Sequence, residues 1–181
     1  MGVLERQGYE VLQDAYGREG RLFSVHCDLL YQCDLDCAHC YLDHKATHNR
    51  STAFWKDVFD QLGQLGVAAL TLSGGEIFLR PDILELVAHA RSRGFIVSLK
   101  THGGRIGEVE AARLAELGVS EVQVSYYSPD PEVHDRITRR AGSHQATLKA
   151  MKVMVAHGLG VVASCSATRI NFEHLEATAA Q

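Results

Sequence analysis

Apolar positions along the chain follow two patterns in turn, one typical of buried strands and one typical of helices. Short apolar runs rich in β-branched residues predict strands at residues 21–29, 67–72, 95–99, 119–125 and 160–166. Between these runs, apolar residues recur every three or four positions, which is the spacing of one helix face. Three groups keep this helical spacing: Phe54, Val58, Leu62 and Leu65; Ile83, Leu86, Val87 and Ala90; and Leu148, Met151 and Val155.

Four glycines each follow an amphipathic stretch and precede a predicted strand. These glycines are Gly66, Gly94, Gly118 and Gly158, and each stands where a helix ends in the left-handed conformation that glycine adopts at little cost. The resulting order, β-α-β-α-β-α-β-α-β, favours an α/β fold with a parallel sheet and right-handed crossovers. In such folds the loops at the carboxyl ends of the strands carry the chemistry, so we expect the functional residues there.

The two ends of the chain differ from this repeat. Residues 1–20 are polar and form a lead segment, whereas residues 21–181 form the α/β core. Residues 171–181 have the pattern of a further helix, through Phe172, Leu175 and Ala179. We therefore expect about five βα units that are truncated C-terminally within that last helix.

Composition narrows the class of protein. The chain has 181 residues, of which 46% are hydrophobic, with a net charge of −4. These values suit one globular domain and give no reason to expect nucleic-acid binding. No apolar run approaches the roughly 20 residues that cross a bilayer, and residues 1–20 lack the apolar core of a signal peptide. We expect a cytoplasmic protein that binds no membrane.

Three of the five cysteines lie within eight residues, directly after the first predicted strand. Cys33, Cys37 and Cys40 have the spacing Cys-x3-Cys-x2-Cys, whereas Cys27 and Cys165 stand apart. In a reducing compartment such a group is more often metal-binding than disulfide-forming. Iron–sulfur cubanes usually have four cysteine ligands, so three thiolates would leave one iron open to another ligand, as catalytic zinc sites keep one open position.

Spacing alone leaves other sites open. A zinc site of three cysteines and one histidine is possible with His39, His44 or His48. Asp34 and Asp36 are more readily explained as solvated carboxylates than as ligands.

A second motif follows the second predicted strand. Gly74, Gly75 and Glu76 are, taken alone, more often a plain turn. Two glycines also let the backbone approach a ligand, and a carboxylate can receive an ammonium group. Their position one strand after the cysteines favours the ligand-binding interpretation.

Together these segments resemble the radical S-adenosylmethionine (SAM) superfamily. The resemblance rests on CDLDCAHCY, on SGGEIFLRPDIL and on VQVSYYSPDPEVHDRITRRAGSHQATLKAM. The last segment is similar to the fourth-strand region of the peptide-modifying branch that carries C-terminal SPASM-type domains. The resemblance runs from about Val25 to Asn171 and implies part of a (β/α)6 barrel.

The resemblance also implies roles for individual residues. Cys33, Cys37 and Cys40 would each bind one iron of a [4Fe-4S] cluster, and the amino and carboxylate groups of SAM would chelate the fourth iron. Glu76, with the backbone of Gly74 and Gly75, would hold the SAM ammonium. The remaining SAM contacts would come from Ser125 at the ribose or carboxylate, from Thr101 and Gly103 along the pocket, and from His39 and Tyr41 beside the adenine.

Two departures from the family pattern qualify these assignments. Relatives often have His-Asp-x-x-Arg-Gly where this chain has residues 134–139, so the arginine that pairs with the SAM carboxylate is displaced; Arg139 is the substitute, or else part of a solvated basic run. Tyr126 and Tyr127 replace the usual Leu-Asp, and one of them must point away from the site. We expect His134-Asp135 to cap the next helix and Cys165 to be a small buried hydrophobic residue.

The implied activity is reductive cleavage of SAM to a 5′-deoxyadenosyl radical that modifies a ribosomally made peptide or protein. No general base can be assigned. A tetrapyrrole- or heme-processing enzyme is the alternative within the family, and a structural zinc module is the alternative outside it. Expected partners are a peptide or protein substrate and a reductant such as flavodoxin or ferredoxin.

Relatives usually add a sixth strand and a cysteine-rich C-terminal domain with auxiliary clusters. Only Cys165 follows Cys40 in this chain, so we expect no auxiliary-cluster domain within these 181 residues. We expect this form to be inactive on its natural substrate even if it binds SAM. The open barrel edge would also allow self-association.

Overall fold

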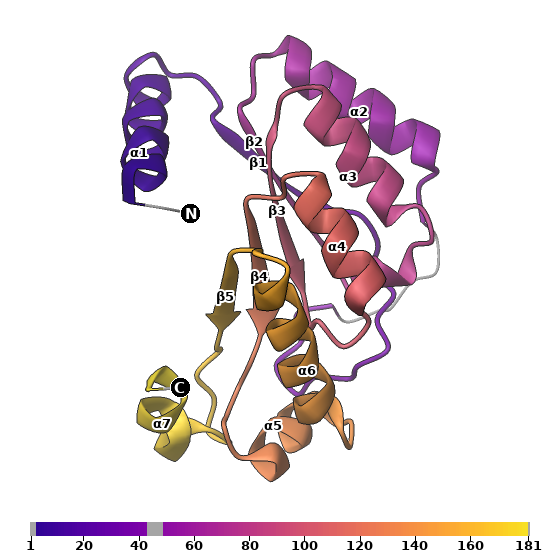
Figure 1. Ribbon diagram of the computed structural model, residues 1–181, viewed down its shortest axis with the longest axis vertical. Helices are drawn as coiled ribbons and strands as arrows, with labels where there is room; N and C mark the ends of the chain where they lie inside the picture. The colour runs from indigo at the N-terminus through magenta and orange to yellow at the C-terminus, as the bar shows by residue number, and fades with distance from the viewer. Residues whose placement is uncertain (1–2, 43–48, 181) are drawn as a thin grey trace.

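A computed structural model describes residues 3–42 and 49–180, which form a parallel sheet with helices against one face (Figure 1). The strand order is β1-β2-β3-β4-β5, and each neighbouring pair is parallel. The strands are β1 Ser24–Asp28, β2 Ala69–Ser73, β3 Ile96–Thr101, β4 Glu121–Ser125 and β5 Val161–Ser164. The five predicted strands and the partial barrel are confirmed.

The two faces of the sheet have opposite character. Residues such as Leu72, Leu99 and Val122 are buried against the helices. On the other face, His26, Lys100 and Ser125 line a cavity. Because side chains alternate along a strand, this polar face follows directly from the strand sequences.

The helices that cover the sheet fall between successive strands. They are α2 Thr52–Gln64, α3 Ile83–Ser92, α4 Glu108–Glu116 and α6 Ser143–Ala156, and the shorter α5 Pro131–Thr138 lies at the carboxyl end of the sheet (Figure 1). The core between these helices and the sheet includes Phe59 and Leu86. Gly66, Gly94 and Gly118 all have positive φ after the helices, as does Gly158, which confirms their predicted role.

The lead segment is a helix, which the sequence analysis did not anticipate. Helix α1 spans Val3–Arg18. The rings of Tyr9 and Tyr16 meet that of Phe23 edge-on, with centroids 5.0 and 5.3 Å apart, and the Tyr16 hydroxyl donates to the Gly66 carbonyl at 2.9 Å. These contacts hold α1 beside the amino ends of the strands, opposite the end where the cysteines lie (Figure 1).

The helical pattern predicted at the end of the chain is also present. A 3-10 helix η2, Phe172–His174, leads into α7, Leu175–Ala179. Another 3-10 helix, η1 at Ile77–Leu79, follows β2. Within the described ranges, no helix has the length and apolar character needed to cross a membrane.

Candidate functional site

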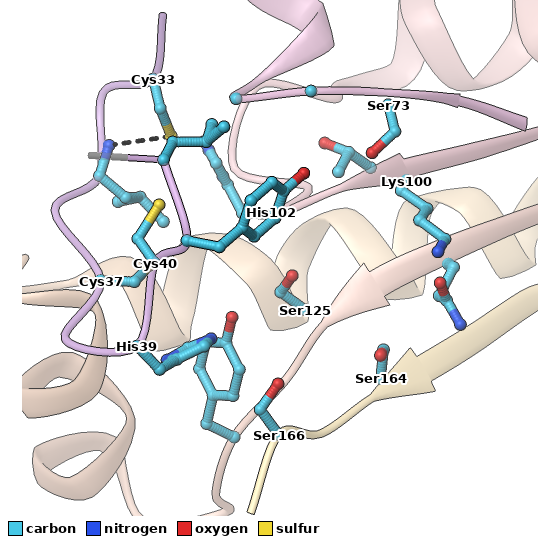
Figure 2. A pocket seen from close by; sticks show the side chains of 18 of the residues that line it. Cys33, Cys37, His39, Cys40, Ser73, Lys100, His102, Ser125, Ser164 and Ser166 are labelled. Atoms are coloured by element: carbon cyan, nitrogen blue, oxygen red, sulfur yellow. Dashed lines mark hydrogen bonds between the residues drawn. The ribbon is translucent and has the colours of Figure 1, made fainter. Parts of the chain in front are cut away.

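A cavity of about 370 Å³ lies at the carboxyl end of the sheet. It brings together nine of the twelve residues singled out from the sequence, and these are Cys33, Cys37, His39, Cys40, Tyr41, Gly74, Gly75, Thr101 and Ser125. Figure 2 shows the cysteine loop on one side of the cavity and the strand residues on the other. Glu76, Gly103 and Arg139 are not among the lining residues.

The cysteine loop is held by backbone hydrogen bonds to the end of α5. The amide of Asp36 donates to the Thr138 carbonyl at 3.2 Å, and that of Ala38 donates to the Ile137 carbonyl at 2.8 Å. Carbonyls at the end of a helix have no partner within the helix. The amides of the cysteine loop donate to these carbonyls of α5, and the same hydrogen bonds fix the position of the loop. Leu35, between the first two cysteines, is buried and anchors the loop further.

The spacing of the thiols fits a cluster better than a single ion. Among the described residues, the metal-binding atoms gathered within 4.8 Å of one another belong to Cys33, Asp34 and His102, not to the three cysteines. Tetrahedral zinc, with Zn–S near 2.3 Å, would bring three sulfurs to about 3.8 Å apart. A larger four-iron cluster suits three more widely spaced thiols that face one cavity.

Of the three histidines considered as zinc ligands, the structure describes only His39. The His39 ring packs edge-on to the Tyr127 ring, with centroids 4.9 Å apart, and burial lowers the pKa of His39. His44 and His48 lie outside the described residues.

Gly74 and Gly75 are required by a close approach of backbone. The Gly75 amide donates to the Leu30 carbonyl at 2.8 Å, and a Cβ on Gly75 would lie 2.1 Å from the Gln32 carbonyl oxygen. A Cβ on Gly74, which has φ +132°, would lie 2.2 Å from the Leu30 oxygen. The sequence analysis assigned this approach to a ligand. In the structure the glycines first accommodate the start of the cysteine loop, while still lining the cavity.

Glu76 is fully buried and bonded to the protein itself. Its carboxylate accepts hydrogen bonds from the Phe78 amide at 3.0 Å, from the Thr101 hydroxyl at 2.8 Å and from the His102 amide at 3.0 Å. Because these donors occupy the carboxylate and it does not line the cavity, the geometry does not support the predicted direct contact between Glu76 and the SAM ammonium. Glu76 instead fixes the turn after β3.

That turn contains the Thr-His-Gly motif. The Gly103 amide donates to the Thr101 hydroxyl oxygen at 2.9 Å. Gly103 has φ +80°, and a Cβ there would lie 3.2 Å from the Val124 side chain. Gly103 therefore closes the turn behind the cavity, and Thr101 alone of this pair faces the cavity.

His102 joins this turn to the cysteine loop. Its Nε2 lies 2.9 Å from Asp34 Oδ1 and 3.1 Å from Glu76 Oε2. Its Nδ1 accepts from the Gly104 amide at 3.0 Å, so Nε2 carries the proton that faces the carboxylates. The sequence alone did not predict this link, because His102 and Asp34 lie 68 residues apart along the chain.

Asp34 is part of the scaffold rather than a solvated carboxylate. Arg105 Nε donates to its Oδ2 at 3.0 Å. Burial acts to raise the pKa of Asp34, but the hydrogen bonds from His102 and Arg105 and the charge of the Arg105 guanidinium outweigh burial and lower that pKa.

Arg139 lies outside the cavity. It ends α5 in the left-handed conformation, with φ 55°, and its guanidinium lies 3.1 Å from Asp36 Oδ2. The prediction that Arg139 pairs with the SAM carboxylate is therefore not supported. Its neighbour Arg140 donates to the Asp34 carbonyl at 3.1 Å, so this basic run braces the cysteine loop.

Of the two tyrosines after β4, one faces the cavity and the other points away from it, as the alternation of side chains along a strand requires. Tyr127 lines the cavity, and burial raises its pKa to about 12, so its phenol stays protonated. Tyr126 is buried beside the rings of His134 and His144, with centroids 5.7 Å away in each case.

Asp135 caps α6, as predicted for the His134-Asp135 pair. Its carboxylate accepts from the amides of Gly142 and His144 at 2.6 and 2.8 Å, and from the Ser143 hydroxyl at 2.7 Å. Cys165 is exposed, which contradicts the expected buried position: it lies just beyond the end of β5, the edge strand of the described sheet.

Comparisons with solved structures point to one fold. SuiB of Streptococcus suis bound to precursor peptide SuiA has a TM-score of 0.79 at 18% identity, covering 95% of this chain and 41% of that chain. SuiB bound to S-adenosylmethionine has a TM-score of 0.75 at the same identity and coverage. The structure of anSMEcpe with bound AdoMet and Cp18Cys peptide has a TM-score of 0.73 at 19% identity, covering 86% of this chain and 46% of that chain. The chain thus spans less than half the length of these proteins.

A family model settles the membership. The model of the Radical SAM superfamily matches residues 29–180, which is most of the chain and includes the cysteine loop and the Gly-Gly-Glu segment. Enzymes of this family use a [4Fe-4S] cluster and SAM, and the three thiols that face one cavity fit that cofactor pair. The chain belongs to the radical SAM superfamily.

Proposed function

We propose that this chain is the catalytic core of a radical SAM enzyme that modifies a ribosomally made peptide or protein. The observation that carries the proposal is the similarity, over 95% of the chain, to a SuiB structure that holds a precursor peptide. The structure of anSMEcpe with a bound peptide supports it. The polar open face of the sheet would offer hydrogen-bonding groups to a peptide backbone.

In this proposal Cys33, Cys37 and Cys40 hold the cluster. When bound, the cluster supplies the electron that cleaves SAM to methionine and a 5′-deoxyadenosyl radical, which abstracts hydrogen from the substrate. The chain's own residues position the reactants. Ser125 lines the cavity, Thr101 holds the turn beside the cavity through its hydrogen bond to Glu76, and Tyr127 and His39 form an aromatic wall that limits access of water.

The reductant would be an acidic carrier such as flavodoxin or ferredoxin. Arg105, Arg139 and Arg140 lie around the cysteine loop, and basic side chains favour encounter with an acidic partner. The proposed location is the cytoplasm, where thiols stay reduced.

Self-association is proposed through the edges of the sheet. Within the described residues, β1 and β5 each pair with one neighbour, and unpaired strand edges are templates for association. A monomer at all concentrations in size-exclusion chromatography with light scattering would refute this part.

The proposed function is tested under anaerobic conditions. The reconstituted protein is incubated with SAM and dithionite, with and without the short peptides encoded beside its gene. The proposal predicts 5′-deoxyadenosine formation and, in the full-length enzyme, a peptide of changed mass. No 5′-deoxyadenosine with fully loaded full-length enzyme, or its formation with no encoded peptide modified, would contradict the corresponding part of the proposal.

A further inference from the structure

Lys100 brings a positive charge into the cavity from the open face of the sheet. Figure 2 shows its side chain reaching into the cavity from β3, among Ser73, Ser125 and Ser164 of the neighbouring strands. Among the described lining residues, Lys100 is the only lysine or arginine. Its cross-strand neighbour in β4 is Gln123, which also lines the cavity, so an amide stands beside the ammonium.

Two carboxylates, Asp28 and Glu121, lie on the same face of the sheet as Lys100. Asp28 of β1 lies 3.1 Å from His26 Nε2 and accepts from the Tyr41 hydroxyl at 3.4 Å. Glu121 is in register with Ser98, two residues before the Lys100–Gln123 pair and closer to the amino ends of the strands. No carboxylate of the described residues lies within 4.0 Å of the Lys100 ammonium.

The basic residue once expected to serve this cavity is also engaged elsewhere. Arg139 pairs with Asp36 outside the cavity. A cation that faces a binding cavity, with no carboxylate of the described part of the chain in contact with it, is a natural partner for an anionic ligand group, because charged hydrogen bonds are the stronger ones.

We propose that Lys100, assisted by Gln123, binds a carboxylate of the molecules that occupy this cavity. Two molecules could supply this carboxylate: SAM, through its methionine carboxylate, and the peptide substrate, through an acidic side chain. For both, the inference rests on the proposed function. In the second case Lys100 selects peptides with glutamate or aspartate next to the modified residue.

The first arm of the test compares SAM with decarboxylated SAM, which differs in lacking the carboxylate. Binding of both is measured by equilibrium dialysis to the cluster-loaded protein and to Lys100→Met. If Lys100 binds the SAM carboxylate, the variant loses about tenfold in affinity for SAM, the effect of one charged hydrogen bond, and keeps its affinity for decarboxylated SAM. Lys149→Met, an exposed lysine on α6, serves as the matched control.

The second arm follows acetylation of the Lys100 amine by mass spectrometry in SAM-loaded protein. If the substrate supplies the carboxylate, N-acetylglutamate amide protects Lys100 whereas N-acetylglutamine amide does not, and Lys149 reacts equally with both. The inference is overturned if Lys100→Met binds SAM as the unaltered protein does and the glutamate probe gives no protection. Both readouts are independent of turnover, so failure to modify any peptide would refute the proposed function without touching this result.

Discussion

The imidazole of His102 lies 2.9 Å from the carboxylate of Asp34, and this contact joins the end of β3 to the loop that carries the three cysteines. The same nitrogen is 3.1 Å from Glu76, whose carboxylate fixes the Thr-His-Gly turn. The cysteine loop and the turn beside the cavity are therefore held by one set of hydrogen bonds. A disturbance of either element is expected to reach the other.

Replacing His102 by alanine tests this connection. We expect His102→Ala to lower the free energy of unfolding by about 1–3 kcal/mol, because it leaves partly buried carboxylate oxygens without their donor, and to shorten retention of the cluster during anaerobic gel filtration. The control is His157→Ala: His157 lies 2.8 Å from Glu108 at the surface, where such a pair contributes about 0–1 kcal/mol. Equal stability and cluster retention in the two variants would contradict the account.

Substitution of Glu76 by glutamine keeps the shape of the side chain but turns one acceptor into a donor. The amide group would then face donors from Thr101, His102 or Phe78. We expect Glu76→Gln to cost about 1–3 kcal/mol in chemical denaturation, with Glu10→Gln, an exposed position on α1, close to neutral. If Glu76 served SAM alone, the variant would retain full stability in the absence of SAM.

Gly75 tests the close approach of the two loops. In Gly75→Ala the new methyl would lie 2.1 Å from the Gln32 oxygen, so the loop must shift, and we expect a loss of more than about 2 kcal/mol and of cluster loading. Gly17→Ala is the matched control, because a methyl there meets nothing within 4 Å and alanine favours a helix by about 1 kcal/mol. Thermal unfolding of both variants measures the difference, and an unshifted Gly75→Ala would be inconsistent with the structure.

His134 predicts a specific loss of stability in mild acid. Burial, with the charge of His144, lowers its pKa from 6.5 to about 4. The unfolded chain therefore binds more protons than the folded chain between those values, and the free energy of unfolding falls as the pH falls from 6.5 to 4. The contribution approaches about 3 kcal/mol, since one pKa unit corresponds to about 1.4 kcal/mol.

Urea denaturation at several pH values measures this slope. We expect His134→Gln to flatten it between pH 6.5 and 4, whereas His157→Gln, at a partly exposed site, leaves it unchanged. A slope that persists in His134→Gln would assign the acid sensitivity to other groups.

The strands and the cysteine site could be predicted because local patterns determine them. Each strand is an apolar run bounded by glycine, and Cys33, Cys37 and Cys40 lie in one short loop, so neither depends on distant contacts. Helix α1 was missed because its polar residues gave no long apolar stripe, and it gains stability from Tyr9 and Tyr16 on Phe23.

The orientation of individual site residues depends on contacts with segments that are distant in the sequence. The sequence therefore predicts these orientations less well than it predicts the strands. Glu76 turns into the protein because Thr101 and His102, on the next strand, offer donors. Arg139 ends α5 in the left-handed conformation and contacts Asp36, which local sequence does not reveal, and its pairing with the SAM carboxylate stays a prediction. Lys100 had a local signal, the alternation of polar and apolar residues in β3, but the predicted strand at residues 95–99 ended just before it.

The central claim is that three thiols hold the cluster, and metal analysis after anaerobic reconstitution tests it most directly. The unaltered protein should bind about four iron and four sulfide per chain, with broad visible absorbance. Joint replacement of Cys33, Cys37 and Cys40 by alanine should abolish this binding, while Cys165→Ala retains it. Undiminished iron in the triple variant, or stoichiometric colourless zinc in the unaltered protein, would contradict the account.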